Sequence, residues 1–102
     1  MTQIDLMPED LDILRNVLKN GPALRMKVFV FGARATGNPS PGAGLDLAID
    51  AERALTLEEQ ATIAAALAES GLPYAIRIED LHAVDEALRA VIEREKAPLL
   101  LI

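Results

Sequence analysis

One dense apolar run, residues 26–31, constrains the fold of this chain more than any other segment. It has the sequence Met-Lys-Val-Phe-Val-Phe, and Gly32 follows it directly. β-Branched and aromatic side chains favour an extended backbone, and a short apolar run that ends at a glycine is typical of a buried strand. The fold must therefore contain a sheet, and this segment is expected inside it.

Two further segments carry the alternation of a strand. Residues 45–50 place apolar side chains on one face and Asp46 and Asp50 on the other, because successive side chains of a strand point to opposite sides. Residues 74–79 alternate in the same way. We therefore expect three strands, the second with two carboxylates on one face.

Helical spacing and end signals predict three helices. They run from Pro8 to the Gly21-Pro22 pair, from Thr56 to Gly71, and over about residues 84–96. Thr56 and Glu59 fit a capping box, and Asp80 or His82 is expected to cap the last helix. The predicted order is α-β-β-α-β-α in one domain, residues 1–102, with a small mixed β-sheet packed with helices. This is an α/β (α+β) fold, and its apolar tail, residues 99–102, should dock on its own domain or enter a partner.

Composition narrows the class of protein. Hydrophobic residues make up 51% of the chain and cysteine is absent, which fits a globular core without disulfides or thiolate metal sites. The net charge of −6 disfavours binding to nucleic acid or to an anionic membrane. No apolar run reaches the roughly 20 residues that span a bilayer, and the first residues lack the charge pattern of a signal peptide. We expect a cytoplasmic protein.

Residues 30–50 carry a motif. The first part reads Phe-Gly-Ala-Arg-Ala-Thr-Gly from Phe31, and the second part reads Gly-Leu-Asp-Leu-Ala-Ile from Gly44, with ten residues between Ala33 and Gly44. This pattern resembles the signature of the DNA polymerase β-type nucleotidyltransferase superfamily, whose smallest members are the minimal nucleotidyltransferases. Their signature is an apolar strand, Gly-Ser, an Arg-rich turn, and Asp-x-Asp on the next strand. A third carboxylate follows on a later strand.

The resemblance implies a metal-dependent chemistry that this chain is poorly equipped to perform. Two Mg²⁺ ions, roughly 3.5–4 Å apart, stabilise the attacking and leaving oxygens of such a transfer and need hard oxygen ligands. Asp46 is the one family carboxylate retained. The degenerate positions are Ala33, which replaces the family Ser, Gly44, which replaces the first Asp, and Arg77, which replaces the third. We therefore expect no metal site and no cofactor, with Mg²⁺ and ATP required only if the chain is active.

Two alternatives are open at these positions: phosphate binding, and a metal site in which another acid replaces the missing carboxylates. Gly32 matches the family glycine, so Gly32 and Arg34 are the candidate phosphate-binding residues. Asp46 with Glu79 could hold one weak Mg²⁺, whereas Asp50 lies about 13 Å along the strand from Asp46 and is too distant. Arg77 is expected to form an ion pair with Asp46; the alternatives are independent solvation of both side chains, or a metal-free anion site.

The functional expectation follows from these losses. We expect an inactive homologue of the nucleotidyltransferases that acts as an antitoxin-like binding or regulatory subunit, because the resemblance implies a HEPN-type helical protein as partner. The alternative is an active Mg-dependent enzyme that moves AMP from ATP to a protein or small acceptor, and a third class is a nucleotide or anion sensor. A homo-oligomer is also open, through the Ala-rich helix. His82 is interpreted as a capping or surface residue.

Overall fold

A computed structural model describes residues 4–20, 26–37 and 43–100 of the chain. The elements in chain order are α1 (Pro8–Lys19), β1 (Lys27–Phe31), α2 (Ala33–Thr36), β2 (Leu45–Asp50), α3 (Leu57–Ala68), β3 (Ile76–Asp80), α4 (Glu86–Glu95) and β4 (Ala97–Leu100). The predicted order is confirmed and extended by the one-turn helix α2 and the strand β4. The Gly21-Pro22 stop lies outside the described residues.

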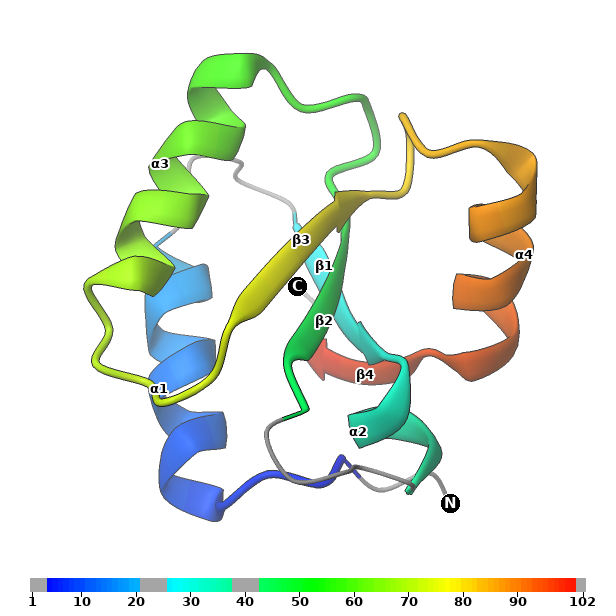
Figure 1. The fold of residues 1–102 in the computed structure, drawn as a ribbon. Helices are drawn as coiled ribbons and strands as arrows, with labels where there is room; N and C mark the ends of the chain where they lie inside the picture. Colours follow the sequence, from blue (N-terminus) through cyan, green and yellow to red (C-terminus); the bar gives the residue numbers. More distant parts are fainter. Residues whose placement is uncertain (1–3, 21–25, 38–42, 101–102) are drawn as a thin grey trace.

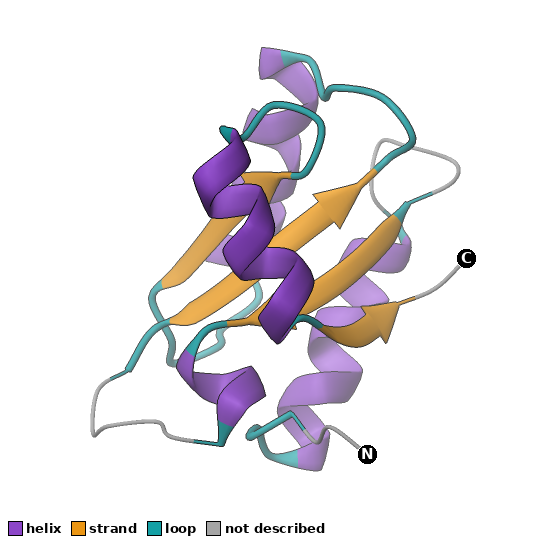
Figure 2. Ribbon diagram, turned by 90° about the vertical axis from the view of Figure 1, so that its right-hand side faces the viewer, coloured by secondary structure: helices purple, strands orange, loops and turns teal. Residues whose placement is uncertain are grey.

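The four strands form one mixed sheet in the order β3-β2-β1-β4. β1 pairs antiparallel with β2 and β4, and β2 pairs parallel with β3 across the α3 connection. α1 and α3 cover one side of the sheet, and α4 lies across the other side (Figures 1 and 2). The mixed α/β class predicted from the sequence is therefore confirmed.

Each side of the sheet has its own apolar cluster. The larger cluster lies under α1 and α3 and is centred on Val28, Val30, Leu45, Leu47 and Ile49, all fully buried. The smaller one, under α4, consists of Phe29, Phe31, Ala48, Leu81 and Ile92. Successive residues of β1 enter opposite clusters, which explains why its sequence is apolar without alternation.

The helix ends match the sequence signals in part. Thr56 and Glu59 form the predicted capping box, with both reciprocal hydrogen bonds present. The cap predicted for α4 is wrong, because Asp85 takes that role and accepts a hydrogen bond from the Leu88 N–H. Asp80 is instead buried, where it accepts the N–H groups of Leu55 and His82. No helix in the described part of the chain is long and apolar enough to cross a bilayer.

The apolar tail docks on its own domain as far as Leu100. Lys96 leaves α4 in an extended conformation, and Pro98 lies in the strand that follows. β4 pairs with β1, and Leu99 is buried in the larger cluster. Residues 101–102 lie outside the described part.

Candidate functional site

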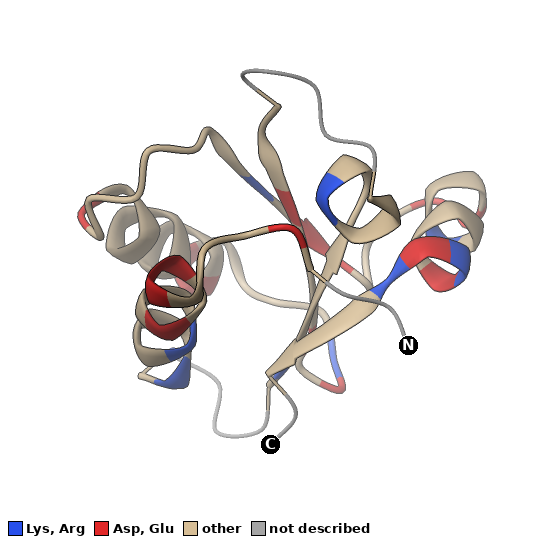
Figure 3. Cartoon of the chain, turned by 90° about the horizontal axis from the view of Figure 1, so that it is seen from below, with Lys and Arg blue, Asp and Glu red and all other residues tan. Residues whose placement is uncertain are grey.

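The end of β1 and the starts of β2 and β3 meet at one edge of the molecule, which Figure 3 views from below. The register places Phe31 opposite Asp46, and Asp46 beside Arg77 of β3. Gly32 follows β1 at this edge and begins α2. The fold therefore brings the retained carboxylate next to the glycine turn, as the family resemblance implies.

Asp46 forms the expected contact with Arg77, but a loose one. Arg77 Nε lies 3.6 Å from Asp46 Oδ1, and the two side chains are 77% and 29% exposed. An exposed ion pair of this length contributes between roughly 0 and 1 kcal/mol to stability. Arg77 thus neutralises the carboxylate without being fixed over it.

Gly32 is enclosed by two carboxylates. Its backbone has φ +78° and ψ −155°, a conformation almost restricted to glycine, and a Cβ there would lie 2.6 Å from Asp46 Oδ2. Its N–H, the group expected to meet a phosphate, donates a hydrogen bond to Glu95 Oε1 at 3.1 Å. A carboxylate of the chain itself therefore occupies that donor.

Sequence reasoning did not identify Glu95. It is the last residue of α4, 63 positions after Gly32, and lies among the charged residues that end this helix. A carboxylate at a helix C-terminus is electrostatically unfavourable, which is the one sequence signal that points to a special role. The contact with Gly32 offsets that cost.

Arg34, the second candidate phosphate ligand, is engaged within the domain. Its Nη1 and Nη2 donate to the backbone carbonyls of Asp5 and Ala43, at 3.1 and 2.9 Å. Its guanidinium also lies over the Tyr74 ring, 4.5 Å from the centroid. Arg34 therefore ties the segment before α1 and the start of β2 to α2, rather than projecting toward Gly32 as a free anion ligand.

The two other altered positions lack the family's polar group, and Gly44 also lacks the room for it. Ala33 is the first residue of α2 and supplies no hydroxyl. At Gly44, a Cβ would lie 2.9 Å from the backbone oxygen of Ala75, because the Leu45 N–H draws that carbonyl close with a 2.9 Å hydrogen bond. An aspartate at Gly44 would require the backbone before β3 to move.

The remaining acidic candidates lie elsewhere. Glu79 is paired in register with Ala48, two residues further along the sheet from Asp46. Asp50, at the far end of β2, is 2.6 Å from His82 Nε2. Burial by itself raises the pKa of Asp50, but hydrogen bonds from His82 and from the Glu52 N–H outweigh it, so the pKa lies below its ordinary value. His82 thus pairs with an acid at the surface and does not cap α4.

These residues do not fit a pair of magnesium ions. Within residues 4–20, 26–37 and 43–100, no group of three His, Cys, Asp or Glu side chains is placed to hold a metal ion. Asp46 alone remains of the family carboxylates, and its neighbour is a cation. A two-metal mechanism needs shared carboxylates, so no catalytic step can be built through metals on this geometry.

Fold and motif together define a nucleotidyltransferase-type domain. The family model described as "Polymerase beta, Nucleotidyltransferase" matches residues 9–100, so the chain belongs to that family. The chain is also 29% identical, over 92 residues, to the probable protein adenylyltransferase MntA of Haemophilus influenzae, covering 90% of this chain and 80% of that protein. The resemblance to minimal nucleotidyltransferases is thereby confirmed.

Two solved structures share the fold. One is a crystal structure of a toxin-antitoxin with AMP-PNP, which has a TM-score of 0.75 at 20% identity and covers 94% of this chain and 75% of that one. The other is a mutant of the toxin-antitoxin MntA-HpeT, with a TM-score of 0.74 at 16% identity and coverage of 90% and 73%. At these identities the likeness establishes the architecture alone.

Proposed function

We propose that this chain has lost metal-dependent nucleotidyl transfer and acts as a binding or regulatory subunit, antitoxin-like, for a HEPN-type helical protein. All 102 residues would form one cytoplasmic domain. The observation that carries the proposal is the surroundings of Asp46 and Gly32, at the edge where the end of β1 meets the starts of β2 and β3. Asp46 stands alone beside Arg77, and the Gly32 N–H is already bonded to Glu95.

Three separate obstacles to catalysis support this proposal. The hydroxyl position is Ala33, so no side chain there can contact a triphosphate. The space at Gly44 is closed by a backbone carbonyl. Any metal would also have to compete with the Arg77 guanidinium for Asp46. Because each obstacle is independent, a single compensating change elsewhere does not restore the site.

The binding role draws its support from the proteins that share the fold. Both solved structures are described as toxin-antitoxin assemblies, and one is named MntA-HpeT. A subunit that binds its partner needs the folded surface and not the metals, so it can lose its carboxylates and keep this role.

A transfer assay and a binding assay test the proposal together. The chain is incubated with labelled ATP, Mg²⁺ or Mn²⁺, and a candidate HEPN-type helical protein, and the mixture is then separated by gel filtration. We expect co-elution of the two proteins without label transfer. Transfer that Asp46→Ala abolishes would overturn the loss of catalysis, and separate elution of two folded proteins would overturn the partner.

The alternative is an active enzyme that moves AMP from ATP to a protein or small acceptor. It is favoured by one observation, the position of Asp46 Oδ2 against the Gly32 turn, and by the activity in the name of the Haemophilus influenzae relative. Glu95→Gln is the discriminating variant. If Glu95 only blocks the Gly32 N–H from a phosphate, removing its charge should raise the affinity for ATP, measured by calorimetry with Mg²⁺.

A further inference from the structure

The outer edge of β3 is open in the part of the chain that the structure describes. β3 ends the sheet order and pairs there only with β2. A free strand edge presents unpaired backbone N–H and C=O groups and readily accepts a further strand. We propose that this edge pairs with the same strand of a second copy, antiparallel about a twofold axis at Ile78.

The direction of the backbone groups defines which residues can pair outward. Ala75 O accepts from the Leu45 N–H, and the Leu81 N–H donates to Ile49 O, so odd-numbered residues of this segment bond toward β2. By alternation, Ile76 and Ile78 direct their N–H and C=O groups to the open edge, whereas the Asp80 C=O already accepts from the Ala83 and Val84 N–H groups. A twofold axis at Ile78 makes that residue a hydrogen-bonded pair with its own copy, and it places the Asp80 N–H opposite the Ile76 C=O of the other copy.

Charge then selects this register over its neighbours. About Ile78, Arg77 of one copy lies opposite Glu79 of the other, twice by symmetry. These are non-hydrogen-bonded positions, where facing side chains lie closest. Axes at Arg77 or Glu79 would instead place like charges opposite each other.

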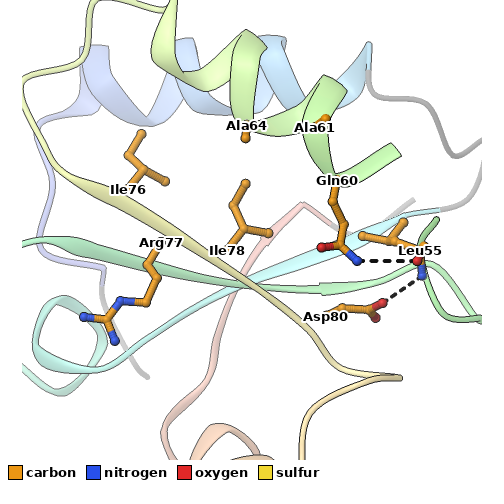
Figure 4. Close-up of a pocket in the computed structure, with 8 residues that line it drawn as sticks. All are labelled: Leu55, Gln60, Ala61, Ala64, Ile76, Arg77, Ile78 and Asp80. Atoms are coloured by element: carbon orange, nitrogen blue, oxygen red, sulfur yellow. Dashed lines mark hydrogen bonds between the residues drawn. The ribbon is translucent and has the colours of Figure 1, made fainter. Parts of the chain in front are cut away.

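Arg77 is available for such a contact. Its side chain is 77% exposed and its pairing with Asp46 is long, at 3.6 Å. Figure 4 shows the Arg77 side chain extending away from α3, on the opposite side of β3 from Ile76 and Ile78. The charged pairs and the isoleucines therefore belong to opposite faces of the proposed continuous sheet.

The face of β3 that carries Ile76 and Ile78 also favours a second copy of the chain as the partner. A groove of about 410 Å³ separates α3 from β3, and Ala61 and Ala64 line its helical wall while Ile76 and Ile78 line its strand wall. Small side chains on α3 leave room for the facing copy to approach. Because the strand register and the charges are self-complementary, a second copy satisfies both, as an isologous interface requires.

The proposal is independent of catalysis and of the helical partner, and sedimentation velocity tests it on the isolated chain. At physiological ionic strength, where the repulsion of two chains of net charge −6 is largely screened, the wild type is expected to approach twice its 11.0 kDa mass as its concentration rises. A monomer at every concentration up to the solubility limit would refute the proposal.

Charge-swap variants test the register. Arg77→Glu and Glu79→Arg each place two like-charge pairs in the interface, and each should raise the dimer dissociation constant about tenfold or more. The double swap restores complementarity and should restore dimerisation. Arg94→Glu on α4 makes the same change in net charge as Arg77→Glu, but away from β3, and should leave the dimer unaltered. Single swaps that dimerise like the wild type, or a folded double swap that stays monomeric, would overturn this pairing.

Discussion

The Gly32 turn yields the sharpest energetic prediction, because backbone and side-chain effects can be separated there. Gly32→Ala must hold alanine at φ +78° and ψ −155°, which costs about 1–3 kcal/mol. Its Cβ must also displace Asp46 Oδ2 from 2.6 Å, and turning this part-exposed side chain off its rotamer costs about 0.5–1.5 kcal/mol. We expect a total of about 2–4 kcal/mol, which lowers Tm by roughly 8 °C or more for a domain of this size.

Gly37 supplies the matched control. Its φ of +83° also lies in the left-handed region, but a Cβ there meets nothing within 4 Å. Gly37→Ala should therefore lose only the backbone component, about 1–2 kcal/mol. The measurement is urea denaturation followed by circular dichroism, with equal slopes checked so that the free energies of unfolding can be compared.

A double-mutant cycle isolates the contact itself. In an Asp46→Ala background the carboxylate is gone, so Gly32→Ala should cost about 0.5–1.5 kcal/mol less than in the wild type. Gly32→Ala could instead lower the free energy of unfolding equally in both backgrounds, or by no more than Gly37→Ala does. Either result would mean that Asp46 does not contact the Gly32 turn and that the geometry described for the site is wrong.

Three other predictions concern separate parts of the molecule. Asp80→Ala leaves two backbone N–H groups without their carboxylate acceptor and should lower the free energy of unfolding by about 2–4 kcal/mol, measured by urea denaturation; a loss below about 0.5 kcal/mol would contradict it. The hydrogen bond from Arg53 holds the pKa of Glu59 at about 2, against 4.5. The unfolded chain therefore binds the proton more readily, and stability should fall as pH drops from about 4.5 to 2. Glu59→Gln should flatten this part of a Tm–pH profile, and an unchanged slope would refute the assignment. Gly44→Asp with Arg77→Asp should start from a lower Tm, because a backbone carbonyl lies 2.9 Å from the new Cβ, and should gain a Mg²⁺-dependent rise in Tm that neither single variant shows.

Local sequence patterns predicted the second strand and the start of α3, where the chain interacts with its near neighbours. The alternation over Leu45–Asp50 defined the strand and the face that carries Asp46. Thr56 and Glu59 defined the start of α3, because the capping box is formed by residues three apart. The cap of α4 was missed because Asp80, Asp85 and His82 are all plausible from sequence, and burial assigns Asp80 to other donors.

The family resemblance likewise implied that Asp46 and Gly32 belong to one site. It also identified three altered positions without any coordinates. What it could not supply was the environment of those positions, since residue type says which group is missing but not what fills its place.

Only the tertiary structure decided what surrounds the site. The chain by itself determined a mixed sheet, its helices and a solitary Asp46, because these follow from local periodicity and motif spacing. The packing of α4 brought Glu95 to the Gly32 N–H over 63 positions, the pairing of β2 with β3 closed the space at Gly44, and β1 drew in the tail as β4. Such contacts depend on how distant elements come together, and no local pattern encodes the distance between them.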